Sequence, residues 1–310
     1  MPNMRIKIGE VEALFQYPVK SMSGEALEVA DLGWHGLDGD RRLAFRRLDD
    51  RGGFPWLTAS RLPELILFAP LRRGPAVDGH LPTHVRTPEG VELAVFSQEL
   101  AADVARRHGS PVEMTHLNRG IFDEASISVI TSTTVGEVGM LAAQRPDVRR
   151  FRPNILIASL RSIPFEEDEW VGGVLSFGES NETAALGITN RDERCSMVNF
   201  DPDSVRPAAE ILKTIVRVRD NKAGVYGTVT RRGRIATGQP VFFQPADQAE
   251  CWIEREVERE PTWPTGARGG SIGRLVSIEP CHREASGFDT GGASEGRAAG
   301  PRTGVRSDDG

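Results

Sequence analysis

The chain has 310 residues, a hydrophobic fraction of 39%, a charged fraction of 26% and a net charge of −6 at pH 7. This length is enough for one large domain or two ordinary ones, and the composition is that of a globular protein with a sizeable core. The negative balance argues against a protein that binds nucleic acid or a membrane surface over its whole length.

The first hundred residues predict mainly β-structure. Segments such as IGEVEALFQYPV are rich in β-branched and aromatic residues, and Gly/Asp-rich turns separate them. We expect a hairpin turn at residues 49–52 and another at Pro88-Glu89-Gly90. Short strands at this spacing are typical of a barrel or a sandwich.

Three helices are expected among these strands. The segment SQELAADVARRHG has a candidate cap at Ser97 and a stop at Gly109. A second helix follows the strand SISVI, with Thr134 and Glu137 at the spacing of a capping box. A third, VRPAAEILKTIVRV, has a proline near its start, where the missing N–H is harmless.

The last part of the chain differs in composition. A third hairpin is predicted in GVYGTVTRRGRIATGQPVFF, with its turn at residues 232–233. After about residue 246 the sequence becomes charged, and residues 283–310 are rich in Gly, Ser, Arg and Asp. Such a segment cannot bury a core, so we expect the tail to be disordered.

Cysteine and histidine usage argues against several metal sites. The three cysteines, Cys195, Cys251 and Cys281, are far apart and form no CxxC pair. We therefore expect no iron–sulfur cluster and no structural zinc site, and the usage fits a reducing compartment. The six histidines show neither HxH nor HExxH spacing. No segment has the apolar length of a signal peptide core or of a membrane span, so we expect a soluble, cytoplasmic protein.

Two segments could bind an anion. Thr131 and Ser132 stand where a strand leads into a helix, and such a helix start offers free N–H groups. In RRFRPNILIA, strand alternation would place Arg150, Arg152 and Asn154 on one face. An ordinary helix cap and a solvated basic edge are the alternative interpretations, and both stay open. Lys20 with Ser21, and Arg41 with Arg42, add cations at strand boundaries.

Cys195 lies in the stretch NRDERCSMVNFDPDS, behind four charged residues and ahead of an Asp-Pro-Asp turn. A free cysteine is usually a small buried hydrophobe. Neighbouring Arg191 and Arg194 would favour a reactive thiolate, whereas Asp192 and Glu193 oppose it. The residues alone do not decide between these two roles.

The order of several short motifs resembles that of one protein family. Tyr-Pro-Val-Lys-Ser is followed by Gly-Asp-Arg-Arg, LTASRLPELILFAP, RFRPNILI and EEDEW, then by Arg-Cys with Asp-Pro-Asp, and finally by GVYGTV and GRIATGQPV. This order resembles MOSC domain proteins with an N-terminal β-barrel domain, and among them the mitochondrial amidoxime reducing component and its bacterial counterparts. The resemblance covers roughly residues 8 to 245.

The resemblance implies an α+β, β-rich fold with an N-terminal MOSC β-barrel domain and a second barrel with flanking helices. We place the domains at residues 1–120 and 121–245, followed by an extension at 246–282 and the tail at 283–310.

The resemblance also implies a cofactor and a site. Cys195 would be the catalytic residue and the ligand of molybdenum, which the molybdopterin form of the molybdenum cofactor holds through its dithiolene. A soft thiolate suits such a metal. The implied contacts to the pterin and its phosphate are Lys20, Ser21, Arg42, Thr131, Ser132, Arg152, Asn154 and Arg194. Pyridoxal phosphate is not expected, since the chain has no desulfurase domain.

The implied function is a molybdenum-dependent oxidoreductase that reduces N-hydroxylated or related N-oxygenated small molecules. Some bacterial relatives carry a ferredoxin domain that this chain lacks. We therefore expect electrons from a separate ferredoxin- or flavoprotein-type donor, and neither nucleic acid nor membrane as a partner. Two alternatives stay open: a sulfur carrier or transferase with a persulfide on Cys195, and a carrier of the cofactor without turnover.

Overall fold

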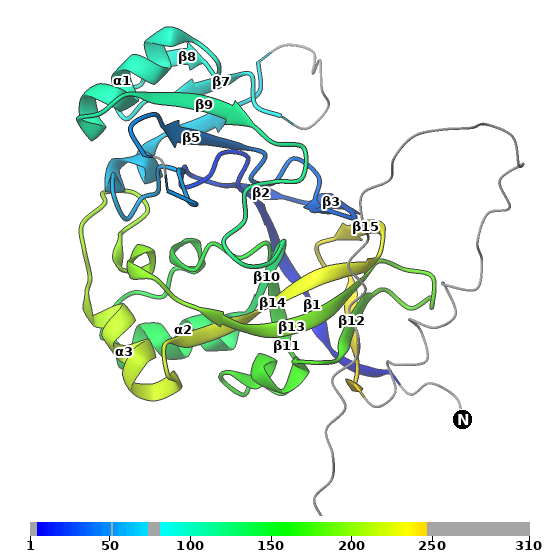
Figure 1. Ribbon diagram of the computed structural model, residues 1–310. Coiled ribbons are helices and arrows are strands. Elements are labelled where there is room, and N and C mark those ends of the chain that lie inside the picture. Colours follow the sequence, from blue (N-terminus) through cyan, green and yellow to red (C-terminus); the bar gives the residue numbers. More distant parts are fainter. Residues whose placement is uncertain (1–4, 51, 74–80, 247–310) are drawn as a thin grey trace, which may run out of the picture. The chain divides into compact units, whose positions relative to one another are not determined.

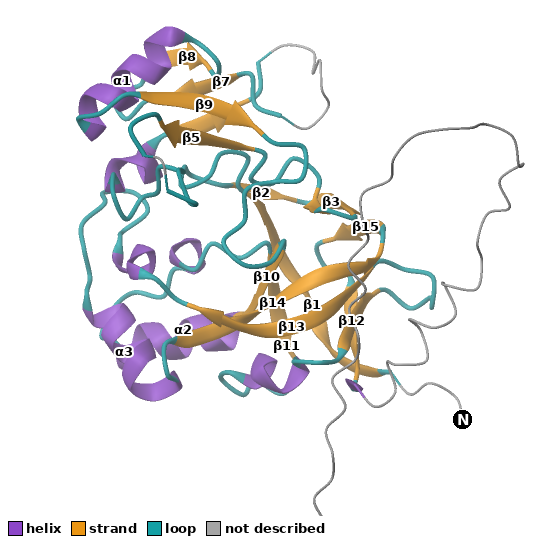
Figure 2. Cartoon of the chain, viewed as in Figure 1, coloured by secondary structure: helices purple, strands orange, loops and turns teal. Residues whose placement is uncertain are grey.

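The computed structural model describes residues 5–50, 52–73 and 81–246 (Figure 1). Within these ranges strands dominate and three α-helices accompany them. Figure 2 shows the strands in orange and the helices, including short 3-10 helices, in purple. The predicted β-rich α+β class is confirmed. None of the helices in the described ranges combines the length and apolarity that a bilayer crossing requires.

A closed barrel of seven strands forms the largest part of the fold. It closes because β11 pairs with β10 on one edge and with β1 on the other. In order around the barrel the strands are β11 (Ile155–Ser159), β10 (Ile127–Thr131), β14 (Lys222–Arg231), β13 (Ala185–Glu193), β12 (Val174–Phe177), β16 (Pro240–Gln244) and β1 (Ile6–Gln16). Only β10 and β11 run parallel, and β2 (Glu25–Leu27) adds to the end of β1.

The barrel strands follow from their alternating apolar residues. In β10, Val129 joins the apolar core that β1, β11, β13 and β14 also line, whereas Ile130 joins a different core. Side chains of consecutive strand residues point to opposite faces of a sheet. Both faces of β10 are therefore buried, and all five of its residues are buried, Ser128 and Thr131 included.

Two helices cover the second face of β10. The second core joins Ile130 to Val138 of α2 (Ser132–Leu141) and to Ile215 of α3 (Glu210–Arg219). The sequence placed the cap of α2 at Thr134, but the helix begins one turn earlier. Thr131 is its N-cap and its hydroxyl accepts a hydrogen bond from the Thr134 N–H at 3.1 Å.

The remaining strands of residues 29–116 form small sheets, of which those before residue 38 pack on the barrel core through Ala30, Leu32 and Leu37 and those after residue 42 lie beside a third apolar core. They are β3 (Val29–Gly33), β4 (Gly36–Leu37), β5 (Leu43–Arg47), β6 (Ala69–Leu71), β7 (His84–Arg86), β8 (Glu92–Ala94) and β9 (Val112–His116). Helix α1 (Gln98–His108) packs on this core through Leu100 and Val104. The predicted cap at Ser97 and the stop at Gly109 are confirmed, and so is the β7–β8 hairpin around residues 88–90.

One predicted hairpin is present only as a short pairing, and another is wrong. β5 pairs with β9 along its length, and across residues 49–52 it forms an antiparallel bridge from Arg46 to Trp56, flanked by backbone hydrogen bonds of 2.8 and 2.7 Å. β15 (Gly233–Ala236) pairs with β3 rather than with β14. The end of β14 next to this turn pairs instead with β13, through Arg231 and Ala185.

The described residues leave some predictions open. The first strand, β1, lies in the same barrel as strands from residues 127–244, and the domain boundary at residue 120 stays a prediction. The extension beyond residue 246, the tail at 283–310, Cys251 and Cys281 lie outside the described residues.

Candidate functional site

A pocket of about 470 Å³ contains Cys195, and we call it the cysteine pocket. Residues from both halves of the described chain line it. Those that the argument uses are Lys20, Ser21, Arg41, Asp123, Ser128, Arg152, Asp192, Arg194, Cys195 and Tyr226. The pocket therefore brings together the cysteine and four of the predicted cofactor contacts: Lys20, Ser21, Arg152 and Arg194.

Cys195 sits at the end of the long strand β13. It is the N-cap residue of a short 3-10 helix, η4 (Ser196–Asn199), and it is exposed and free. The hydroxyls of Ser196 and Ser60 lie 3.3 Å apart, so the next residue touches the segment that leads into η1 (Pro63–Leu67). The thiol is therefore presented to the pocket rather than buried in a core.

Three residues of the pocket hold a strained backbone. Ser21, Arg41 and Arg152 have φ angles of 67°, 48° and 52°, in the left-handed region. Residues with a side chain rarely adopt this conformation, and each instance costs on the order of 1–3 kcal/mol. Three such residues from separate segments converge on one pocket. Strain of this kind concentrates at functional sites, because there it aims side chains that regular structure could not.

The aromatic ring of Tyr17 packs against the guanidinium groups of two of these residues, Arg41 and Arg152. The guanidinium carbons of Arg152 and Arg41 lie 4.1 and 4.9 Å from the centre of its ring. The Tyr17 N–H donates to Asp40 at 2.6 Å, and Asp40 forms an ion pair with Arg41. Burial raises the pKa of Tyr17 to about 12, so the phenol stays neutral. The Tyr-Pro-Val-Lys motif thus supplies both a support, Tyr17, and a lining residue, Lys20.

Arg152 keeps a donor that no described residue uses. One guanidinium nitrogen, Nη1, donates to the carbonyl of Met22 at 2.7 Å. The other, Nη2, is buried and has no hydrogen-bond partner among the described residues. Burial lowers the pKa of Arg152 to about 10, which leaves it charged at neutral pH. A buried, charged donor of this kind is costly unless a ligand accepts from it.

The other two lining cations already have partners. The Lys20 ammonium donates to Asp123 at 2.9 Å and to the Ile121 carbonyl at 3.2 Å, and burial lowers its pKa. Arg194 donates to the carbonyls of Ala223 and Phe151, each at 2.7 Å, and pairs with Asp192 at 2.8 Å. Arg194 is therefore fixed by the protein itself and supports the wall next to Cys195.

The structure places four predicted contacts outside the cysteine pocket. Asn154 is fully buried behind it and accepts from the Ser128 N–H at 3.1 Å and from Arg41 at 3.3 Å. Thr131 is buried and donates to Glu167 at 3.0 Å, and Ser132 is the first residue of α2. Arg42 lines a different pocket. Their predicted role as cofactor contacts stays untested.

Sequence reasoning counted Arg41 only as a cation at a strand boundary and missed Asp192 as a lining residue. Arg41 takes the place in the pocket that was assigned to Arg42, because its left-handed backbone turns it inward. Asp192 is buried and accepts from Ser128 at 2.8 Å, and burial raises its pKa to about 6. The paired arginines of Gly-Asp-Arg-Arg were the only sequence signal for Arg41.

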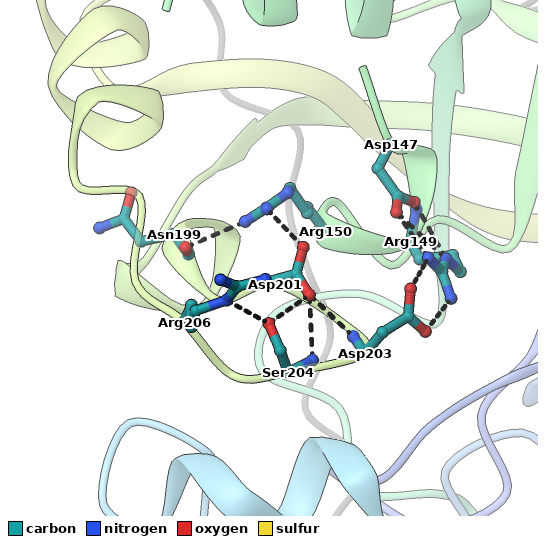
Figure 3. A network of polar contacts seen from close by, with 8 residues as sticks. All are labelled: Asp147, Arg149, Arg150, Asn199, Asp201, Asp203, Ser204 and Arg206. Carbon is teal, nitrogen blue, oxygen red and sulfur yellow. Dashed lines mark hydrogen bonds and ion pairs between the residues drawn. The ribbon is translucent and has the colours of Figure 1, made fainter. Parts of the chain in front are cut away.

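Arg149 and Arg150 do not share a face with Arg152. Both belong to η2 (Val148–Arg150), a 3-10 helix ahead of the strand, so strand alternation does not apply. Figure 3 shows that they bind the loop after Cys195, which we call the aspartate loop, residues 201–204. Arg150 donates a hydrogen bond to Asp201 at 3.1 Å, and Arg149 donates to both carboxylate oxygens of Asp203 at 2.7 and 2.8 Å.

Asp201 also organises the aspartate loop internally. One of its oxygens accepts from the N–H groups of Asp203 and Ser204, at 3.2 and 3.0 Å, and from the Ser204 hydroxyl at 2.8 Å. Arg150 adds a hydrogen bond to the Asn199 carbonyl in η4. The Asp-Pro-Asp motif therefore ties the helix that Cys195 caps to the segment that carries Arg152.

Comparisons with known proteins agree with this architecture. Residues 8–127 match the model of the MOSC N-terminal beta barrel domain, and residues 95–242 match that of the MOSC domain. None of the curated proteins matches the chain.

Two solved structures show a distant similarity to this chain. The YUAD protein from Bacillus subtilis is 15% identical over 78% of this chain and 99% of its own, with a TM-score of 0.43. YiiM from Geobacillus stearothermophilus is 18% identical over 43% of this chain and 65% of its own, with a TM-score of 0.30. The two domain models together span residues 8–242, so the chain belongs to the family of MOSC domain proteins that carry an N-terminal MOSC barrel.

Proposed function

We propose that this protein binds a molybdenum cofactor in the cysteine pocket and reduces N-hydroxylated small molecules. The observation that carries the proposal is that one pocket holds both the exposed, free thiol of Cys195 and the guanidinium of Arg152, which has a buried nitrogen without a hydrogen-bond partner among the described residues. MOSC domains are generally associated with the molybdenum cofactor, and the match to that domain supports the proposal.

The residues present fit such a cofactor. A phosphate needs charged hydrogen-bond donors, and Arg152 has a buried Nη2 to offer. Ser21 and Arg41 line the same wall. A thiolate is a suitable ligand for molybdenum, and Cys195 is accessible to it. In this proposal Cys195 binds the metal, while Arg152, Arg41 and Ser21 hold the pterin phosphate and Lys20 lies beside them.

When bound, the cofactor would supply two-electron chemistry at its metal. The overall reaction takes an N–OH compound, two electrons and two protons, and gives an N–H compound and water. The electrons come from a separate ferredoxin- or flavoprotein-type donor. The chain's own residues bind and orient the cofactor, and the exposed position of Cys195 admits substrate and solvent protons.

Metal analysis tests the proposal directly. The full chain is expressed in a host that makes the cofactor, and molybdenum per chain is measured together with reduction of an N-hydroxylated model substrate by a chemical electron donor. We expect about one molybdenum per chain and turnover. Cyanolysable sulfur without molybdenum would instead identify a sulfur carrier, and molybdenum without turnover a cofactor carrier.

A further inference from the structure

A second pocket, of about 440 Å³, lies on the other side of the Arg41–Arg42 pair, and we call it the tryptophan pocket. Its walls include Trp34, His35, Asp38, Arg42, His116 and Asn118. None of these residues lines the cysteine pocket. The volume falls in the range of sites that bind small molecules, roughly 300–1,000 Å³.

Arg42 gives this pocket a buried positive charge. Its side chain is only 7% exposed, and Nη1 donates to the Asn118 carbonyl at 2.8 Å. Within the described ranges no carboxylate oxygen lies within ion-pair distance of its guanidinium. Asp38 and Asp40 favour its charged form from farther away, while burial lowers its pKa. An arginine buried without an ion pair is costly, and an anion reaching it from the pocket would remove that cost.

Trp34 gives the pocket a flat aromatic surface. Trp34 is 53% exposed, and the guanidinium carbon of Arg232 lies 5.2 Å from the centre of its ring. Exposed tryptophan in a pocket is well suited to stack on a planar ring. His35 and His116 also line the pocket and add imidazoles that can form hydrogen bonds. The positive charge that an anion would meet here is the buried guanidinium of Arg42, which has no ion-pair partner within the described residues.

We propose that the tryptophan pocket binds a small anion that carries an aromatic ring, with the anionic group on Arg42 and the ring on Trp34. Arginine binds both phosphate and carboxylate in a forked geometry, so an aromatic phosphate and an aromatic carboxylate share this chemistry. The assignment is independent of the cofactor proposal, because the two pockets have no lining residue in common.

Binding of two probes to the purified full chain tests the site. Adenosine monophosphate and benzoate are titrated separately by calorimetry against the wild type, Arg42→Gln and Trp34→Ala. Loss of one charge-assisted contact should weaken the bound probe about tenfold or more. The matched control is Arg234→Gln, which removes an exposed arginine paired with Asp31 and should leave affinity unchanged. The probe that binds more tightly identifies phosphate or carboxylate as the preferred group.

Molybdenum content of the same variants separates this site from the cysteine pocket. We expect Arg42→Gln to keep the molybdenum content of the wild type while it loses the probe. Trp34 is exposed, so Trp34→Ala carries the test if the buried Arg42 variant fails to fold. No millimolar or tighter binding of either probe to the wild type, or equal affinity in Trp34→Ala, would overturn the proposal. Loss of molybdenum from a folded Arg42→Gln would return Arg42 to the cofactor site.

Discussion

The arginines on either side of Phe151 carry the same charge in opposite surroundings. Arg149 and Arg150 meet the carboxylates of the aspartate loop, and Arg149 binds both oxygens of Asp203. Arg152, two residues on, enters the cysteine pocket with one buried nitrogen unpaired. Arg149 and Arg150 have carboxylate partners, whereas Arg152 has none within the described residues and lines the cysteine pocket. Charge alone therefore does not identify a binding residue, and the ion-pair partners of each arginine separate these three.

The largest effect is expected at Cys195, on the pocket side of this comparison. Cys195→Ser keeps the shape but replaces a soft thiolate with a hard, poorly ionised oxygen. We expect the variant to fold, to keep some pterin through the arginine contacts and to lose reductase turnover. The assay compares it with Cys251→Ser and Cys281→Ser, which should stay active. Full activity in Cys195→Ser would overturn the mechanism.

Replacing Arg152 tests whether its free nitrogen awaits a ligand. A charge-assisted hydrogen bond is worth roughly 1.5–3 kcal/mol, so Arg152→Ala should lower cofactor retention at least tenfold. Molybdenum content after gel filtration measures this, and Arg149→Ala is the matched control with unchanged retention. Equal retention in both variants would show that the two kinds of arginine do not differ in function.

Removing Asp201 tests the structural side of the comparison. Asp201→Ala deletes the ion pair with Arg150 and three hydrogen bonds within the loop, so we expect a loss of about 2–3 kcal/mol in the free energy of unfolding. Urea unfolding measures the loss. Asp203→Ala is the control, because its ion pair with Arg149 is exposed and worth at most about 1 kcal/mol. Equal losses of stability in the two variants would contradict the role of Asp201 in holding the aspartate loop together.

The buried carboxyl of Glu167 gives a further test, because its contribution to stability depends on pH. Glu167 is buried and accepts from the hydroxyls of Thr131 and Thr134, and burial raises its pKa to about 7. A carboxyl whose pKa is raised on folding binds a proton more tightly in the folded state. Its favourable contribution is therefore full below about pH 4.5, decreases as the pH rises and is gone above about pH 7, with a change of about 1 kcal/mol between pH 6 and pH 8.

Glu167→Gln cannot titrate, so this variant should gain stability relative to the wild type as the pH rises from 6 to 8. Urea unfolding at the two pH values measures the difference. Glu179→Gln, a change at a residue in an exposed loop, is the control and should track the wild type. A constant difference between Glu167→Gln and the wild type would show that the raised pKa is wrong.

The sequence predicted features that depend on neighbours along the chain. The Ser97 cap, the Gly109 stop and the β7–β8 turn are set by a few adjacent residues, and all three are confirmed. The order of motifs identified the family for the same reason. Features that depend on distant partners were missed. Arg150 differs from Arg152 because Asp201 lies 51 residues away along the chain, and no local pattern reveals this ion pair.

The finding that Arg41 rather than Arg42 lines the cysteine pocket has the same cause, a dependence on distant residues. Which of two adjacent arginines faces the cysteine pocket depends on the left-handed backbone at Arg41. Asp40, Asn154 and the Arg152 carbonyl hold its guanidinium there. Two of these three groups come from more than a hundred residues downstream. Only the folded chain could reveal the choice.

The pairing of β1 with β11 and β16 has a consequence for synthesis on the ribosome. The first strand to emerge must wait for partners at residues 155–159 and 240–244 before both its edges are covered. Contacts between segments so far apart form slowly, and an uncovered strand edge invites pairing with other chains. Nascent chains of this protein should therefore depend on chaperones until Gln244 has left the exit tunnel.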